Sequence, residues 1–241
     1  MEKTVTEAIE YRRSVRVYKD IELDDEKVCQ CLYNASLAPT SSNLQLWEFY
    51  HVTDKTILKA LAKACFDQPA AKTAKQLVVI VARKDLWRKR SKANLANLKK
   101  GFGEKSKAEY STREKFALNY YGKLIPSIYA DFMGVLGWFK YIIFQLIGLF
   151  RPIYKQVRNS DMRIVAHKSA GLAAQNFMIS MAAIGYDTCP MEGSDTGRVK
   201  KVLELPSSAE INMIIACGIR DEKGVYGPRF RIPFNEVYKK V

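Results

Sequence analysis

The chain has 241 residues, of which 48% are hydrophobic and 27% are charged. This composition is that of a folded globular protein, which excludes disordered and fibrous classes. Basic side chains outnumber acidic ones by 39 to 25, so the net charge of +14 favours an anionic partner: nucleic acid, a membrane surface, or an anionic cofactor or substrate.

Five cysteines and two histidines limit the chemistry that side chains alone can supply. The odd number and irregular spacing of the cysteines favour reduced thiols over a disulfide framework or a zinc site. His51 and His167 lie far apart in the sequence, so neither a metal site nor histidine-based catalysis is indicated. We therefore expect any chemistry to be carried by a cofactor. The opening MEKTVTEAIEYRR lacks the apolar run of a secretory leader, which predicts a cytoplasmic location.

Hydrophobic periodicity and capping residues predict an alternation of helices and strands in the first third of the chain. The expected elements are a helix over 4–13, a helix from Asp24 or Asp25 to before Pro39, a strand over 46–52, a helix from Asp54 to about Cys65, and a strand over 76–82. The last of these reads QLVVIVA, a continuous apolar run with many β-branched residues. Such a run is typical of a buried central strand.

The second part of the chain is predicted to be mostly helical. A long excursion over about 84–159 precedes a helix over 161–184 that Gly185 is suited to cap. A second buried strand is expected over 211–217, and the tail beyond Gly224 carries no helix signal before Asn235. Because no repeat or low-complexity linker interrupts the chain, we expect a single domain over residues 1–241.

The start of the excursion is strongly basic. Residues 83–115 contain 12 Lys or Arg and 4 Asp or Glu, a net charge of +8. The stretch has no RNA-recognition, zinc-finger or helix-turn-helix signature, so we expect a solvated helical face and no nucleic-acid partner.

The end of the excursion is strongly apolar. Residues 132–150 contain Lys140 as their one charge, and their apolar side chains recur at helical spacing. The first interpretation of Phe132 to Phe150 is a core, lid or subunit-contact helix. A helix that lies on a membrane surface is the alternative, and a membrane span is the least favoured, because three glycines and Lys140 interrupt the segment.

Four separated motifs carry the main functional signal. They are Arg12-Arg13-Ser14-Val15-Arg16, the segment 38–49 (APTSSNLQLWEF), the segment 190–195 (PMEGSD) and the segment 227–233 (GPRFRIP). Three guanidinium groups and a hydroxyl within five residues suit bidentate contact with phosphate oxygens. Each motif alone is weak, whereas all four in this order and spacing resemble the FMN-dependent nitroreductase family.

The resemblance implies an α+β fold with a central, mainly antiparallel sheet flanked by helices, in an intertwined homodimer with two FMN sites. Arg12, Ser14 and Arg16 match the residues that hold the FMN phosphate and the nearby pyrimidine edge, and Arg13 contributes partly through its backbone. The pair that closes over the phosphate from the tail corresponds to Arg229 and Arg231.

Other matched residues would contact the flavin ring. The loop residues Ser41, Ser42 and Asn43 would come from the other subunit, and Gln68 and Lys72 would approach the pyrimidine edge. The ring would lie beside Pro190, Met191, Glu192 and Gly193, with the backbone N–H of Glu192 or Gly193 directed at flavin N5 or O4.

The function implied is that of an NAD(P)H oxidoreductase with ping-pong hydride transfer through flavin N5 to nitroaromatics, quinones or related conjugated acceptors. The flavin carries the chemistry, so no catalytic side chain is expected. Dehalogenation or flavin fragmentation on the same fold is one alternative. A non-catalytic basic protein that associates with membrane or nucleic acid is another.

Overall fold

The computed structural model describes residues 2–103, 106, 108–131 and 135–241. Helices and strands follow one another along the chain as α1 (Val5–Tyr11), α2 (Asp25–Ser36), η1 (Ser41–Asn43), β1 (Trp47–Val52), α3 (Lys55–Ala64), α4 (Pro69–Thr73), β2 (Gln76–Ala82), η2 (Lys84–Leu86), α5 (Trp87–Phe102), α6 (Thr112–Asn119), η3 (Tyr120–Leu124), α7 (Ile125–Tyr129), α8 (Val135–Ile147), α9 (Asn159–Ala183), β3 (Asp187–Met191), α10 (Thr196–Val202), β4 (Glu210–Gly218) and α11 (Phe234–Val237).

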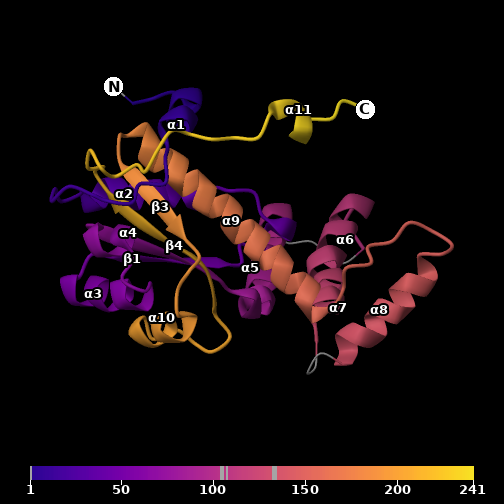
Figure 1. Ribbon diagram of the computed structural model, residues 1–241. Helices are drawn as coiled ribbons and strands as arrows, with labels where there is room; N and C mark the ends of the chain where they lie inside the picture. Colours follow the sequence, from indigo (N-terminus) through magenta and orange to yellow (C-terminus); the bar gives the residue numbers. More distant parts are fainter. Residues whose placement is uncertain (1, 104–105, 107, 132–134) are drawn as a thin grey trace.

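The described strands form an antiparallel sheet in the order β1-β2-β4-β3 (Figure 1). All seven residues of β2 are buried, as its apolar sequence predicts. Alternate side chains of β2 point to opposite faces. Val78 and Ile80 pack with residues of α9 and α2, whereas Val79 and Val81 pack with residues of α3 and α4. The expected α+β fold with a mainly antiparallel sheet is confirmed.

Helix α9 crosses one face of this sheet and is the longest helix among the described residues (Figure 1). Small side chains let it pack closely, and Ala170, Ala173 and Ala174 are fully buried. Asp161 caps the first turn of this helix, because its carboxylate accepts a hydrogen bond from the backbone N–H of Arg158 at 3.0 Å. Gly185 follows its end with φ +85°, the left-handed conformation in which glycine is favoured, so the predicted cap is confirmed.

The chain between β2 and α9 forms the helical excursion that the sequence predicts. Helices α5 to α8 lie to one side of the sheet, and α8 lies at the outer end (Figure 1). Stacking of Trp87 on Tyr129, with ring centroids 5.9 Å apart, joins α5 to α7. No helix among the described residues combines the length and the apolar composition needed to cross a membrane.

The structure corrects two expectations. Strand β3 occupies 187–191, where the sequence predicts no strand, because β4 supplies a complete ladder of partners for this short segment. A core position for the apolar segment 132–150 is also wrong for its described part, residues 135–150. Gly137 is the one buried residue of α8, since the outer side of this helix faces no other element. Residues 132–134 of that segment lie outside the described residues.

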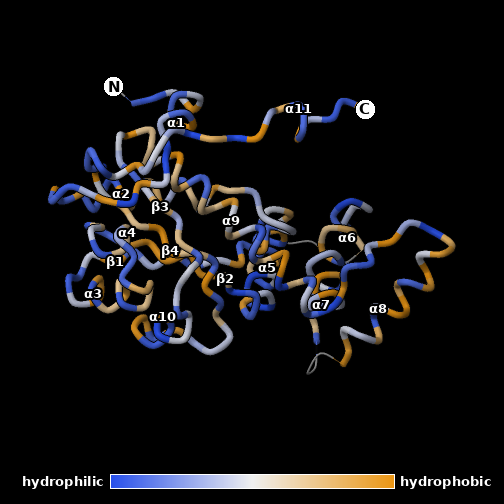
Figure 2. The backbone as a smooth tube through the Cα atoms, viewed as in Figure 1, coloured by the Kyte–Doolittle hydropathy of each residue, from blue (hydrophilic) through white to orange (hydrophobic). Residues whose placement is uncertain are grey.

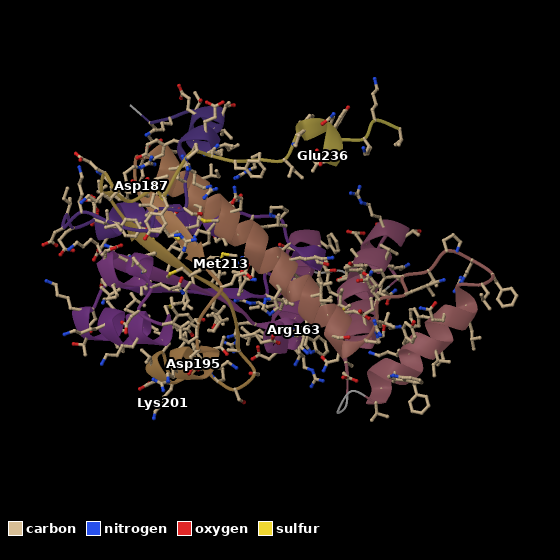
Figure 3. The ribbon with its side chains drawn as sticks, viewed as in Figure 1. Arg163, Asp187, Asp195, Lys201, Met213 and Glu236 are labelled. Atoms are coloured by element: carbon tan, nitrogen blue, oxygen red, sulfur yellow. The ribbon has the colours of Figure 1, made fainter. Side chains whose placement is uncertain are left out.

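An ion pair at the edge of the sheet joins β3 to the end of α1 and to the segment that follows β4. Asp187 lies at the start of β3 (Figure 3) and is 2% exposed. Its carboxylate accepts from the backbone N–H and the Nε of Arg220, each at 2.8 Å. The same guanidinium donates to the carbonyl oxygen of Tyr11 at 3.1 Å and lies 4.0 Å from the Tyr11 ring centroid. The end of α1 is thereby fastened beside β3.

Removal of the Asp187 carboxylate should strongly destabilise the fold. We expect Asp187→Ala to lower the free energy of unfolding by about 3–5 kcal/mol in urea denaturation, because it leaves a guanidinium that is largely enclosed and has no counter-charge. Lys27→Ala is the control, since Lys27 and Asp24 form an exposed pair at 3.9 Å and should cost at most about 1 kcal/mol. An equally small loss for Asp187→Ala would show that the pair does not hold these segments.

Candidate functional site

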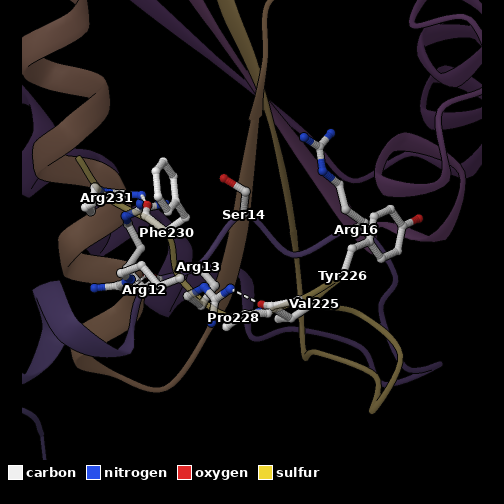
Figure 4. A pocket seen from close by; sticks show the side chains of 11 residues that line it. Arg12, Arg13, Ser14, Arg16, Val225, Tyr226, Pro228, Phe230 and Arg231 are labelled. Atoms are coloured by element: carbon white, nitrogen blue, oxygen red, sulfur yellow. Dashed lines mark hydrogen bonds between the residues drawn. The ribbon is translucent and has the colours of Figure 1, made fainter.

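A cleft of about 380 Å³ opens between the first motif and the C-terminal tail (Figure 4). Two chain segments, 12–16 and 225–231, supply its wall. Its lining residues are Arg12, Arg13, Ser14, Arg16, Val225, Tyr226, Gly227, Pro228, Arg229, Phe230 and Arg231. Arg12 and Arg231 lie on one side, Arg16 and Tyr226 lie on the other, and Ser14 lies between them (Figure 4).

The first segment is held in place by the backbone. Ser14 pairs with Thr188 in an isolated parallel bridge, and the N–H of Val15 donates to the carbonyl oxygen of Thr188 at 3.2 Å. The N–H of Arg16 donates to the carbonyl oxygen of Gly224 at 2.6 Å. Residues 12–16 therefore run beside β3, which brings their side chains close to the segment that begins at Pro190.

Two arginines tie the tail to the first segment. Nη2 of Arg229 donates to the carbonyl oxygens of Glu10 at 2.7 Å and of Arg12 at 2.5 Å. Nη2 of Arg13 donates to the carbonyl oxygen of Gly227 at 2.5 Å (Figure 4). These two guanidiniums thus serve partly to close the wall of the cleft.

The cleft is cationic and has no acidic side chain among its lining residues. Burial lowers the pKa of Arg12, and the neighbouring charges of Arg229 and Arg231 lower it further. Crowded like charges of this kind are unfavourable unless an anion enters among them. The donor geometry of guanidinium groups suits the oxygens of a phosphate or a carboxylate. The charge and the donors of the cleft therefore suit an anion.

The 190–193 segment adjoins this cleft. Cys189, just before it, is fully buried; burial raises the pKa of its thiol, and the charges of Arg16 and Arg12 oppose that rise. At ordinary pH the thiol therefore stays protonated and unreactive. Pro190 and Met191 form the end of β3, and Glu192 and Gly193 follow it as exposed residues.

The turn after β3 presents backbone donors. Gln68 fixes it from α4's N-terminus, because its Nε2 donates to the carbonyl oxygen of Gly193 at 2.8 Å. Within the described part of the chain, the N–H groups of Glu192 and Gly193 have no hydrogen-bond partner. The sequence-predicted Gln68 and the predicted pair of N–H groups are thus brought to one place.

Lys72 and the polar loop are not brought to this cleft. Lys72 lines a separate cavity of about 780 Å³ beside α3, together with other lysines. The loop 41–43 packs against the helical excursion instead. Ser42 Oγ lies 2.7 Å from the hydroxyl of Tyr120, and Nδ2 of Asn94 donates to the carbonyl oxygen of Asn43 at 2.9 Å. Ser41 and its two neighbours therefore belong to a different surface of this chain.

Sequence reasoning missed several residues that build the site. Tyr226 and Val225 line the cleft just before the recognised tail motif, where the only signal was an aromatic residue next to a Gly-Pro turn. Asp187 and Arg220, which fasten the first segment, gave no signal, because they lie 33 positions apart and belong to no motif. The described residues contain no group of three or more His, Cys, Asp or Glu side chains placed to hold a metal ion.

Comparison with known proteins agrees with this geometry. The sequence profile described as "Nitroreductase family" matches residues 9–219. Protein DrgA of Synechocystis is 27% identical over 218 residues, which cover 90% of this chain and 84% of that protein.

Solved structures share the fold over nearly the whole chain. The Bacillus subtilis protein ydfN superposes with a TM-score of 0.73 at 23% identity and covers 98% of both chains. An Exiguobacterium sibiricum protein crystallised in complex with FMN superposes with a TM-score of 0.68 at 20% identity and covers 99% of this chain and 98% of its own. Because the family profile matches most of its length, and the motifs and the fold agree with that match, this chain belongs to the nitroreductase family.

Proposed function

We propose that this protein is an FMN-dependent NAD(P)H oxidoreductase built as a single domain over residues 1–241. The observation that carries the proposal is the acid-free cleft in which Arg12 is crowded by Arg229 and Arg231. A phosphate monoester would neutralise these charges, and FMN carries one. Membership of the nitroreductase family and the FMN complex of a protein with the same fold support the choice of FMN.

The residues present fit the two ends of this cofactor. Arg12 and Arg231 would bind the phosphate, with Arg229 and Arg13 closing the wall behind it. Ser14 and Arg16 would approach the pyrimidine edge. The free N–H groups of Glu192 and Gly193 would donate to the flavin ring, in a turn that Gln68 holds.

When bound, FMN supplies the redox chemistry that passes two electrons from NAD(P)H to an acceptor. The protein binds and orients the cofactor, and its cations favour the anionic reduced form. We propose that NAD(P)H and the acceptor use the same site in turn, in a ping-pong reaction. The acceptors are nitroaromatics, quinones or related conjugated compounds.

The proposed functional unit is a homodimer. The tail beyond the cleft runs away from the body of the protomer (Figure 1), and its apolar side chains Phe234 and Val237 are 72% and 60% exposed. A second copy would cover them. The 41–43 loop, which does not line the Arg12 cleft of its own chain, would then contact the FMN held by that copy. Ser42 and Asn43 have φ of 53° and 48°, a shape that their contacts with the excursion stabilise.

Removal of the tail should dissociate this dimer. We expect the full chain to sediment as a dimer and a chain that ends at Pro233 to sediment as a monomer at the same concentration, because residues 234–241 would leave the interface. A chain that lacks only Lys240 and Val241 is the control and should remain dimeric. A dimer that survives loss of 234–241 would contradict this role of the tail.

Loss of the phosphate ligands should weaken FMN binding. We expect Arg12→Gln and Arg231→Gln each to raise the dissociation constant of FMN by about 10- to 100-fold, because each removes a charge-assisted hydrogen bond worth about 1.5–3 kcal/mol. Titration of the apoprotein with FMN measures this constant. Arg113→Gln, an exposed position on α6, is the matched control and should bind FMN as the wild type does. Wild-type affinity in both cleft variants would refute the assigned phosphate site.

A further inference from the structure

The outer face of α8 is entirely apolar. Every exposed residue between positions 135 and 150 is hydrophobic, and their exposed fractions range from 40% to 90%. These residues are Val135, Leu136, Trp138, Phe139, Ile142, Ile143, Leu146, Leu149 and Phe150. At helical spacing they fall within an arc of roughly 160°. Figure 2 shows this hydrophobic helix at the far end of the molecule from α1 and β3, beside which the cleft lies.

The single charge of this segment is turned inward. Nζ of Lys140 donates to the carbonyl oxygens of Ser127 at 3.1 Å, Ile128 at 2.9 Å and Ala130 at 2.5 Å. These carbonyls lie at the C-terminus of α7, so Lys140 caps that helix. Burial lowers the pKa of Lys140. Lys140 interrupts the apolar run in the sequence, but its side chain points toward α7. The outer face of α8 therefore carries no charge.

Cations lie on the opposite side of the same helix. Arg151 donates its backbone N–H to the carbonyl oxygen of Ile147, the last residue of α8, and the Lys155 side chain packs on Gly148. The Arg158 guanidinium lies 4.8 Å from the ring centroid of Tyr141. Among the residues that the structure describes, no acidic side chain pairs with Arg151 or Lys155, whereas Arg158 pairs with Asp161 at 3.1 Å.

We propose that α8 docks in the plane of an anionic lipid bilayer surface. An apolar face with Lys and Arg on the opposite, polar side of the helix is the arrangement by which interfacial helices bind such surfaces. With 13 residues, α8 is about 20 Å long, too short for the roughly 30 Å of a bilayer core. The net charge of +14 adds attraction to anionic headgroups.

Vesicle binding by the full chain tests this assignment. We expect the protein to sediment with vesicles that contain phosphatidylglycerol, more weakly as salt rises, and not with vesicles of phosphatidylcholine alone. Trp138, 63% exposed on the docking face, should shift its fluorescence to the blue on binding. Trp47 is only 5% exposed, and the variant Trp138→Phe should lose the shift.

Paired variants separate α8 from the rest of the surface. Ile143→Gln with Leu146→Gln should weaken vesicle binding about 10- to 100-fold, because two side chains lose their apolar contact with lipid. Val5→Gln with Ile9→Gln changes two equally exposed residues of α1 and should bind as the wild type does. Circular dichroism checks that both variants are folded, and neither test depends on FMN.

Three results would overturn the proposal. The first is no sedimentation of the wild type with anionic vesicles. The second is equal binding to both kinds of vesicle, which would remove the charge complementarity. The third is a smaller oligomer for the α8 variant in the absence of lipid, which would show that a second copy covers this face.

Discussion

The candidate site depends on the ion pair between Asp187 and Arg220. Residues 12–16 form no strand of the sheet and need something to hold them against it. Arg220 supplies this, because one guanidinium binds the buried carboxylate at the start of β3 and the carbonyl oxygen of Tyr11 just before the motif. The bridge between Ser14 and Thr188 then continues the contact. This attachment and the backbone hydrogen bonds of Val15 and Arg16 together fix the arginines of the first motif relative to the turn after β3.

The same attachment concentrates positive charge. Residues 12–16 lie along β3, and the tail that closes over them places Arg229 and Arg231 beside Arg12. Repulsion among these groups is the energetic cost of the arrangement, and a bound phosphate would offset it. An apolar strand, a basic motif and a tail motif from distant parts of the chain thus produce one cationic cleft. Helix α8 lies at the opposite end of the molecule, so docking there would leave the cleft open (Figure 1).

Strong local signals made much of the fold predictable from the sequence. The continuous apolar run of β2, the small-residue interior of α9 and the Gly185 cap all depend on nearby residues, and the structure confirms them. Strand β3 was not predictable, because its five residues include Pro190 and acquire their strand conformation from β4. The pattern of apolar residues in α8 was visible, but whether another element covers it depends on tertiary packing.

The motifs bring some of the predicted site residues together in one cleft and leave others elsewhere. The motifs place Arg12, Ser14, Arg16 and Arg231 in one cleft, as the structure has them. Lys72 faces a different cavity, since α4 directs it away from β3. Arg229 is engaged by backbone carbonyls, a use of its donors that no sequence pattern reveals.

The visible absorption spectrum of the purified protein, followed by anaerobic addition of NADH or NADPH, tests the central claim most directly. The account predicts the spectrum of a bound oxidised flavin, which bleaches when a nicotinamide nucleotide is added and returns when an acceptor is supplied. A colourless protein that FMN cannot reconstitute, or a bound flavin that neither nucleotide reduces, would contradict it.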